Sequence, residues 1–139
     1  MACFGGTEMG GKVTEARAQI EISTPPEAAW AVVGDFGGIG EWMPGIDSCV
    51  VDGEDRILRL AGLEIIERLE SRDEDAWTIS YRVVSGVPVI NHRATISVAP
   101  SDGGSTVVWD VEVEPEEMVE LFQPTYQQAL GALKEHLGG

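Results

Sequence analysis

Basic residues, cysteines and long apolar runs are all scarce in this sequence. Its 139 residues include 9 Lys and Arg against 24 Asp and Glu, a formal net charge of −15. Nucleic acids and anionic membranes recruit clusters of Lys and Arg, so the composition argues against both as partners. No apolar run approaches the ~20 residues of a membrane-spanning helix, and the start lacks the basic-then-apolar order of a signal peptide. We therefore expect a cytoplasmic protein.

Metal ligands and catalytic motifs are equally sparse. Cys3 and Cys49 show neither Cys-x-x-Cys nor Cys/His spacing, which argues against a zinc site and against a disulfide framework. Only two histidines, His92 and His136, are present. The Gly-x-Ser-x-Gly, P-loop, Gly-x-Gly-x-x-Gly and His-Glu-x-x-His motifs are absent. We expect no metal and no cofactor.

The chain length corresponds to one domain. We expect a flexible, glycine-rich lead-in over residues 1–12 and a single domain over residues 13–139. Within that domain, alternation of apolar and polar residues with period two predicts seven β-strands. Turn residues separate them, and they cover residues 16–22, 46–52, 56–61, 65–72, 76–84, 91–99 and 106–114.

Two short helical pieces are expected between the first two strands. Thr24 is placed to be an N-cap, with Pro25 at the first helical position and Glu27 completing a capping box. A short helix over residues 28–33 follows, and residues 35–45 form a second helical turn or an apolar loop.

The C-terminal segment changes period. After residue 115, apolar residues recur three or four apart, which predicts a long amphipathic helix. Pro124 should kink this helix or mark a late start. A seven-stranded sheet with one apolar face must curl around something, and this helix is the only long apolar element available. The predicted fold class is α+β: a curved antiparallel sheet that grips the C-terminal helix.

Strand alternation also predicts a partly polar interior. It turns Asp47, Glu67, His92 and the Tyr81 hydroxyl inward, among apolar neighbours. Ionisable groups on an apolar face are costly unless paired or hydrated, so several on one concave surface indicate a cavity. One strand separates those of Glu67 and His92, which places them about 10 Å apart. A ligand or a water chain could bridge that distance.

Each inward polar residue also has a structural explanation. His92 could hydrogen-bond a neighbouring strand end, and Glu67 could form an ion pair with Arg56 or Arg82. Asp47 follows a turn and could be half exposed.

The tryptophans of the interior and of the loop after the first helix call for separate interpretations. Trp77 and Trp109 are expected to be core or pocket wall rather than specific stacking platforms. Trp42 and Pro44 lie in a loop with no structural need of an indole, and we interpret them as a lid rather than a plug.

Four short motifs carry a family resemblance. In chain order they are Ile46-Asp47-Ser48-Cys49, Ala61-Gly62-Leu63-Glu64, Glu67-Arg68-Leu69-Glu70 and Asn91-His92-Arg93. With the order of elements, they resemble the SRPBCC/START-like helix-grip superfamily over residues 13–137. Its members include plant abscisic acid receptors, the birch pollen allergen, START lipid-transfer domains and bacterial polyketide cyclase/dehydrase-like proteins.

The resemblance implies binding of an apolar or amphipathic small molecule between sheet and helix. Loops around Leu63 and Val87 would act as gate and latch. The chain departs from the plant receptors at Asp47, where they place a lysine that meets a carboxylate, and at Glu64, where they have a gate proline. Asp47 would repel a carboxylate ligand.

Three functions remain open from the sequence. The leading one is a carrier or sensor of a hydrophobic small molecule, including lipid-like ligands. The alternative is a polyketide aromatase/cyclase or dehydratase in which Glu67, His92 and Tyr81 move protons. The third is an interaction module that forms a homodimer through its gate loops, with an apolar patch around Leu63, Val87 and Trp42. The expected ligand contacts are Asp47, Leu63, Glu67, Trp77, Tyr81, Val87, His92, Trp109, Phe122 and Tyr126.

Overall fold

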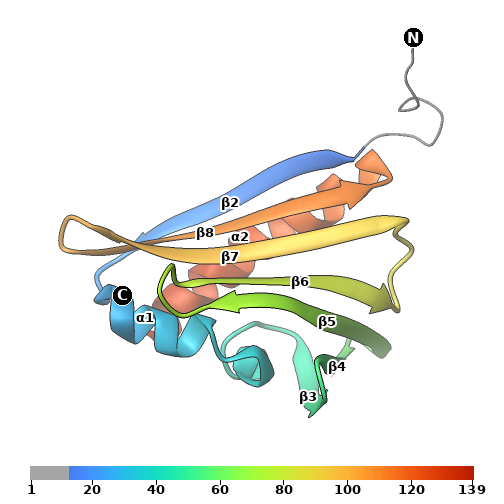
Figure 1. Cartoon of the computed structure of the whole chain (residues 1–139), viewed down its shortest axis with the longest axis horizontal. Coiled ribbons are helices and arrows are strands. Elements are labelled where there is room, and N and C mark those ends of the chain that lie inside the picture. Colours follow the sequence, from blue (N-terminus) through green and yellow to red (C-terminus); the bar gives the residue numbers. More distant parts are fainter. Residues whose placement is uncertain (1–12) are drawn as a thin grey trace, which may run out of the picture.

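The computed structural model describes residues 13–139, and the expected lead-in over residues 1–12 lies outside the described residues. Over the described range, seven strands form one antiparallel sheet that curves around the C-terminal helix α2 (Figure 1). The strands are β2 (Thr14–Ile22), β3 (Ile46–Asp52), β4 (Asp55–Leu60), β5 (Leu63–Asp73), β6 (Thr78–Ser85), β7 (Asn91–Ser101) and β8 (Gly104–Glu114). All seven predicted strands are confirmed.

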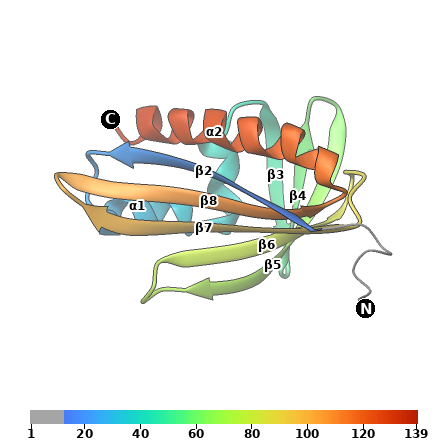
Figure 2. The ribbon, with the colours of Figure 1, turned by 90° about the horizontal axis from the view of Figure 1, so that it is seen from above.

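The strand order is β2-β8-β7-β6-β5-β4-β3, so β3 to β8 follow as a meander and β2 pairs with the last strand. Tight turns join the hairpins, and glycines with positive φ occupy them at Gly53, Gly62 and Gly103. Only glycine adopts that backbone without strain. Figure 2 shows β3 and β4 turned up beside α2, so the sheet closes around the helix.

The helical elements are α1 (Pro26–Val33), η1 (Phe36–Glu41), η2 (Glu116–Met118) and α2 (Val119–His136). The predicted capping box is wrong. Pro25 is the N-cap of α1 and no side chain caps the helix. The Thr24 hydroxyl instead donates to the carbonyl of Leu137, 3.4 Å away. Its side chain ties the start of α1 to the end of α2.

The late start proposed for the C-terminal helix is also wrong. Helix α2 begins at Val119 and Pro124 lies inside it. Two glutamine side chains of α2 hold it against the edge strand β2: Gln123 donates to the Arg17 carbonyl at 3.2 Å and Gln127 to the Gln19 carbonyl at 2.9 Å. This edge of the sheet is therefore fastened to the helix.

The core is solid at the end of the sheet where α1 lies. Helix α1 buries Ala29, Trp30 and Val33 there, and the second half of α2 contributes Leu130 and Leu133, both fully buried. In the described part of the chain, no helix is long and apolar enough to cross a membrane.

Candidate ligand cavity

A cavity of about 130 Å³ lies between the sheet and the first half of α2. Its surface is almost entirely apolar, with Glu67 as its one ionised lining residue. The lining residues are Ile39, Met43, Ile46, Leu58, Leu60, Ile65, Glu67, Tyr81, Val83, Val87, Trp109, Leu121, Phe122, Thr125 and Tyr126. They come from η1, five strands, the β6–β7 loop and α2, so the cavity exists only in the folded chain.

A buried ion pair forms one side of the site. Arg56 on β4 is 3% exposed and Glu67 on β5 is 8% exposed. The strand register places them opposite each other, and Arg56 Nε donates to Glu67 Oε1 at 2.8 Å. The structural alternative for Glu67, an ion pair with Arg56, is confirmed.

Arg56 also anchors the apolar segment that covers the cavity. Its Nη1 donates to the Phe36 carbonyl at 2.9 Å, and its guanidinium lies 4.1 Å from the Phe36 ring centre and 4.6 Å from that of Tyr81. These contacts compensate the desolvation of the charge. The pair therefore links β4, β5, β6 and η1 at one point.

His92 fills a split between two strands. The backbone pairing of β6 with β7 ends at Tyr81 and Ala94. Beyond that point the Val83 N–H donates to His92 Nδ1 at 3.1 Å, in place of a ladder bond. The structural alternative for His92, a hydrogen bond to a neighbouring strand, is confirmed.

The other ring nitrogen of His92 is hydrogen-bonded to a tyrosine that lines the cavity. His92 Nε2 lies 3.2 Å from the Tyr126 hydroxyl, and the Tyr81 hydroxyl donates to the same oxygen at 3.3 Å. Trp109 Nε1 donates in turn to Tyr81 at 3.2 Å. The rings of Trp109 and Tyr126 stack with centres 4.0 Å apart. This aromatic network forms the floor of the cavity.

Burial sets the protonation of the network. Desolvation lowers the pKa of His92 to about 4, so the imidazole is neutral at neutral pH. Desolvation likewise raises the pKa of Tyr81 and Tyr126 well above the ordinary value for tyrosine, and the nearby Glu67 charge adds to the effect. All three rings are uncharged hydrogen-bonding groups under physiological conditions.

The expected lid is only partly where the sequence placed it. Trp42 is 6% exposed and packs against Trp109 with ring centres 5.9 Å apart, and Pro44 is exposed. The residues of this segment that line the cavity are Ile39 and Met43. The segment covers the cavity, but neither Trp42 nor Pro44 touches it, and a buried Trp42 cannot belong to an exposed apolar patch.

The inward orientation expected for Asp47 is wrong. Strand β3 carries a bulge, because Ile46 pairs with Leu60 and Ser48 with Arg59, leaving Asp47 without a partner. An extra residue switches the faces of the strand. Asp47 is consequently exposed, whereas Ile46 packs on the core.

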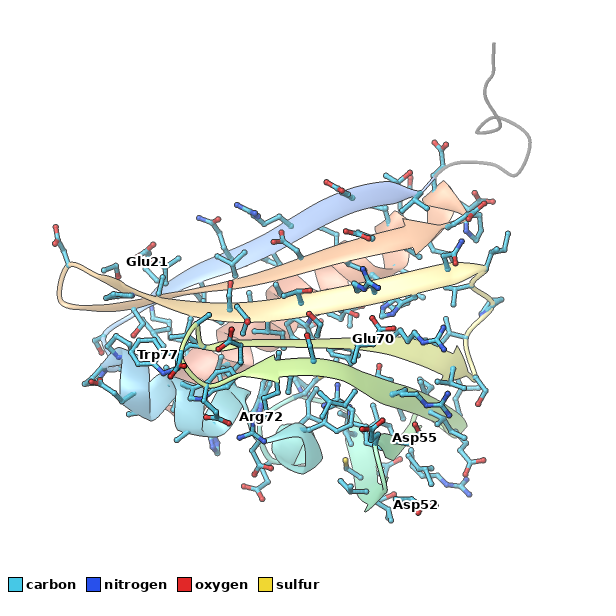
Figure 3. All side chains as sticks on the ribbon, viewed as in Figure 1. Glu21, Asp52, Asp55, Glu70, Arg72 and Trp77 are labelled. Atoms are coloured by element: carbon cyan, nitrogen blue, oxygen red, sulfur yellow. The ribbon has the colours of Figure 1, made fainter. Side chains whose placement is uncertain are left out.

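Two further predicted contacts lie away from the cavity. Trp77 precedes β6 with φ of 54°, which removes it from the strand alternation, and Figure 3 shows it beside α1. Leu63 is 55% exposed. Of the ten predicted ligand contacts, the cavity is lined by Glu67, Tyr81, Val87, Trp109, Phe122 and Tyr126.

Sequence reasoning treated Arg56 only as one possible partner of Glu67 and missed its central position. The signal was present, since Arg56 alternates with Leu58 and Leu60 on one face of β4. The contributions of Ile39, Met43 and Thr125 carry no such pattern, because they depend on how η1 and α2 lie on the sheet.

A second hollow adjoins the cavity on the side of the split strands. This groove of about 560 Å³ is more open and more polar, and His92 lines it, while Val83 and Val87 line both hollows. On the outer face, Glu70 bridges Arg82 and Arg93 across the split, at 3.3 and 2.8 Å. His92 does not line the cavity itself, and it contacts the lining through a hydrogen bond to Tyr126 and through ring packing on Phe122 at 4.8 Å.

The curved sheet, the gripped helix and the enclosed hollow define a helix-grip protein, as the sequence predicted. Residues 13–138 match the family model described as polyketide cyclase/dehydrase and lipid transport. The chain belongs to this family. No protein with a curated description matches the sequence significantly.

Solved structures agree with this assignment. Protein XoxI from Bacillus cereus is 29% identical, with a TM-score of 0.80 over 90% of this chain and 94% of that one. A START superfamily protein from Mycobacterium smegmatis is 18% identical, with a TM-score of 0.74 over 88% and 96% of the two chains. Ara h 8.0201 is 16% identical, with a TM-score of 0.74 over 90% and 97%. The last two likenesses show the fold alone.

Proposed function

We propose that this protein binds an apolar or amphipathic small molecule in the cavity between sheet and helix, as a carrier or sensor. The observation that carries the proposal is the hollow itself: an apolar chamber with a few converging polar groups, beside a core that is otherwise solid. Such chambers are the usual form of small-molecule sites. The family description, which includes lipid transport, is consistent with this role.

The state of the polar groups favours binding over catalysis. A general acid or base works best with a pKa near the working pH, and burial moves the pKa of His92 down to about 4 and that of Tyr81 far up. Glu67 is held by Arg56. At neutral pH His92 and Tyr81 are therefore uncharged and far from their pKa values, and the carboxylate of Glu67 is engaged by a buried arginine.

The size of the cavity points the same way. An engineered cavity of about 150 Å³ holds one benzene molecule, and the cavity here measures about 130 Å³. A poly-β-ketone chain that folds into several fused rings exceeds that volume. The cavity in this structure fits a single ring or a short branched chain.

Tryptophan fluorescence tests the proposal. Of the four tryptophans, Trp109 lines the cavity and Trp42 packs on the Trp109 ring, whereas Trp30 and Trp77 lie at the α1 end. Nitrobenzene is a single-ring quencher that should enter the cavity. The double variant Trp30→Phe/Trp77→Phe retains only Trp109 and its neighbour Trp42, so a larger fraction of its emission should be quenched, saturably.

The control fills the cavity. Ile65→Phe places a larger side chain in the lining and should remove the saturable component while leaving collisional quenching. Saturable quenching that persists in this variant, or that is absent from both proteins, would contradict the proposal.

A further inference from the structure

The hydrogen-bond directions around Tyr126 leave one donor unused. The Val83 N–H occupies Nδ1 of His92, so the proton of this neutral imidazole lies on Nε2. Nε2–H therefore donates to the Tyr126 oxygen, which also accepts the proton of Tyr81. Both acceptor positions of that oxygen are filled by the protein.

The Tyr126 proton itself has no acceptor among residues 13–139. The side chain is 4% exposed and lines the cavity, so a ligand in the cavity is the group that can accept this buried proton. Leaving such a donor unpaired is unfavourable. A ligand that brings an acceptor relieves that cost.

The carboxylate of Glu67 supplies the complementary group. Arg56 Nε donates to its Oε1 atom at 2.8 Å, and Nη2 lies 2.7 Å from the same atom. In the described part of the chain, Oε2 accepts no hydrogen bond. Because Glu67 also lines the cavity, the apolar chamber presents the Tyr126 donor together with a carboxylate acceptor. The Thr125 hydroxyl in the lining donates its proton to the Leu121 carbonyl at 2.7 Å and offers only a further acceptor.

We propose, resting on the function proposed above, that the cavity selects an uncharged single-ring compound bearing a hydroxyl group, a phenol. One hydroxyl accepts from Tyr126 and donates to Glu67, while its ring contacts Trp109, Phe122 and the aliphatic wall. The cavity volume of about 130 Å³ limits the ligand to one ring. A phenolate is excluded, because it cannot donate to Glu67 and meets its charge.

Calorimetric titration of the wild-type protein with phenol and with benzene tests this assignment. A chamber without free polar partners prefers benzene by about tenfold, because the buried hydroxyl of phenol loses its hydrogen bonds to water. The proposal predicts the opposite order, with phenol binding about tenfold more tightly than benzene.

The two proposals fail in different ways. Benzene binding with no gain for phenol overturns the assignment of the polar groups and leaves a purely apolar binding site. If neither compound binds, the function proposed above fails as well.

Two variants locate the effect. Tyr126→Phe removes the free donor and should bring phenol to or below the affinity of benzene, with benzene itself changed less than about threefold. Ser105→Ala removes a buried hydroxyl that does not line the cavity and that donates to the Thr24 carbonyl at 2.6 Å. It should keep phenol ahead of benzene.

Equal loss of the phenol preference in both variants, or its survival in Tyr126→Phe, overturns the role given to Tyr126. If Tyr126→Phe does not fold, the relative affinities of the wild-type protein for phenol and benzene still test the proposal. A site with no free donor binds benzene more tightly than phenol.

Discussion

The two ends of the sheet are built from the same elements and packed differently. At the end that carries α1, Leu130 and Leu133 of α2 are fully buried against strand side chains. At the other end, α2 presents Leu121 and Thr125, and the cavity remains between helix and sheet. Helix α1 fills the first end, and the second is covered only by η1 and its apolar neighbours.

The difference assigns separate roles to the two ends. The solid α1 end stabilises the fold, and the hollow end provides the ligand site. A close-packed core loses stability when any side chain is truncated. The side chains around the hollow are not close-packed in this way, because an ion pair and an aromatic network hold the hollow open. The buried ionisable groups Arg56, Glu67 and His92 accordingly gather at the hollow end, whereas the α1 end buries the hydroxyl of Ser105, which donates to the Thr24 carbonyl at 2.6 Å.

The largest expected effect is loss of the buried ion pair. Arg56→Met leaves Glu67 uncompensated and should lower the free energy of unfolding by about 3–5 kcal/mol. Arg68→Met is the matched control, since its pair with Asp55 is partly exposed and should therefore contribute far less to stability than the buried pair. Chemical denaturation measures both.

The double variant Arg56→Met/Glu67→Met extends that test. It should recover most of the loss, because no buried charge remains unpaired. An equal cost for Arg56→Met and Arg68→Met would contradict the central position given to Arg56.

The next effect compares two leucines of α2 directly. Leu133→Ala, at the solid end, should cost about 2–5 kcal/mol in unfolding free energy. Leu121→Ala, beside the cavity and 51% exposed, should cost less than about 1 kcal/mol and change ligand affinity instead. Similar costs at both positions would show that the two ends are packed alike.

A third prediction uses pH. His92 has a folded-state pKa of about 4 against an ordinary histidine pKa of 6.5, so the unfolded chain binds its proton more readily. Stability is therefore complete above pH 6.5 and is lost as pH falls toward 4, by at most about 3 kcal/mol from this group.

The comparison protein for that prediction is His92→Gln, which has no imidazole to protonate. Urea denaturation at pH 7, 5.5 and 4 should show a smaller decline in this variant than in the wild type. Parallel declines would mean that other groups, not His92, govern acid sensitivity.

A last prediction concerns filling the hollow, where the change is expected in ligand affinity rather than in stability. Ile65→Phe should change the unfolding free energy by less than about 2 kcal/mol in either direction, because space gained is offset by crowding. Affinity for benzene should fall by more than about tenfold. Thermal denaturation and calorimetry on the same samples separate the two quantities.

The sequence predicted the strands and the gripped helix because period-two and period-3.6 patterns depend on burial alone. The same patterns turned Glu67, Tyr81 and Trp109 inward correctly. They failed at Asp47, where one extra residue reversed the faces of β3, and at Trp77, where a left-handed backbone ended the alternation. Local irregularities of this kind cannot be recognised in the apolar and polar pattern of the sequence.

The contacts within the site could not be predicted from the strand faces alone. Whether Glu67 and His92 met a ligand or the protein was open from the sequence, because the answer depends on which side chains arrive from other strands. Arg56 reached Glu67 across β4, and the parting of β6 from β7 gave His92 the Val83 amide. Both are consequences of tertiary geometry.

Methyl NMR during a benzene titration tests the central claim, that the hollow end alone accepts a ligand. Chemical shifts should move saturably for cavity methyl groups, such as those of Leu58, Ile65 and Val83, and stay fixed for Leu130 and Leu133. Shifts that spread equally over both ends of α2, or no saturable shifts at all, would contradict the account.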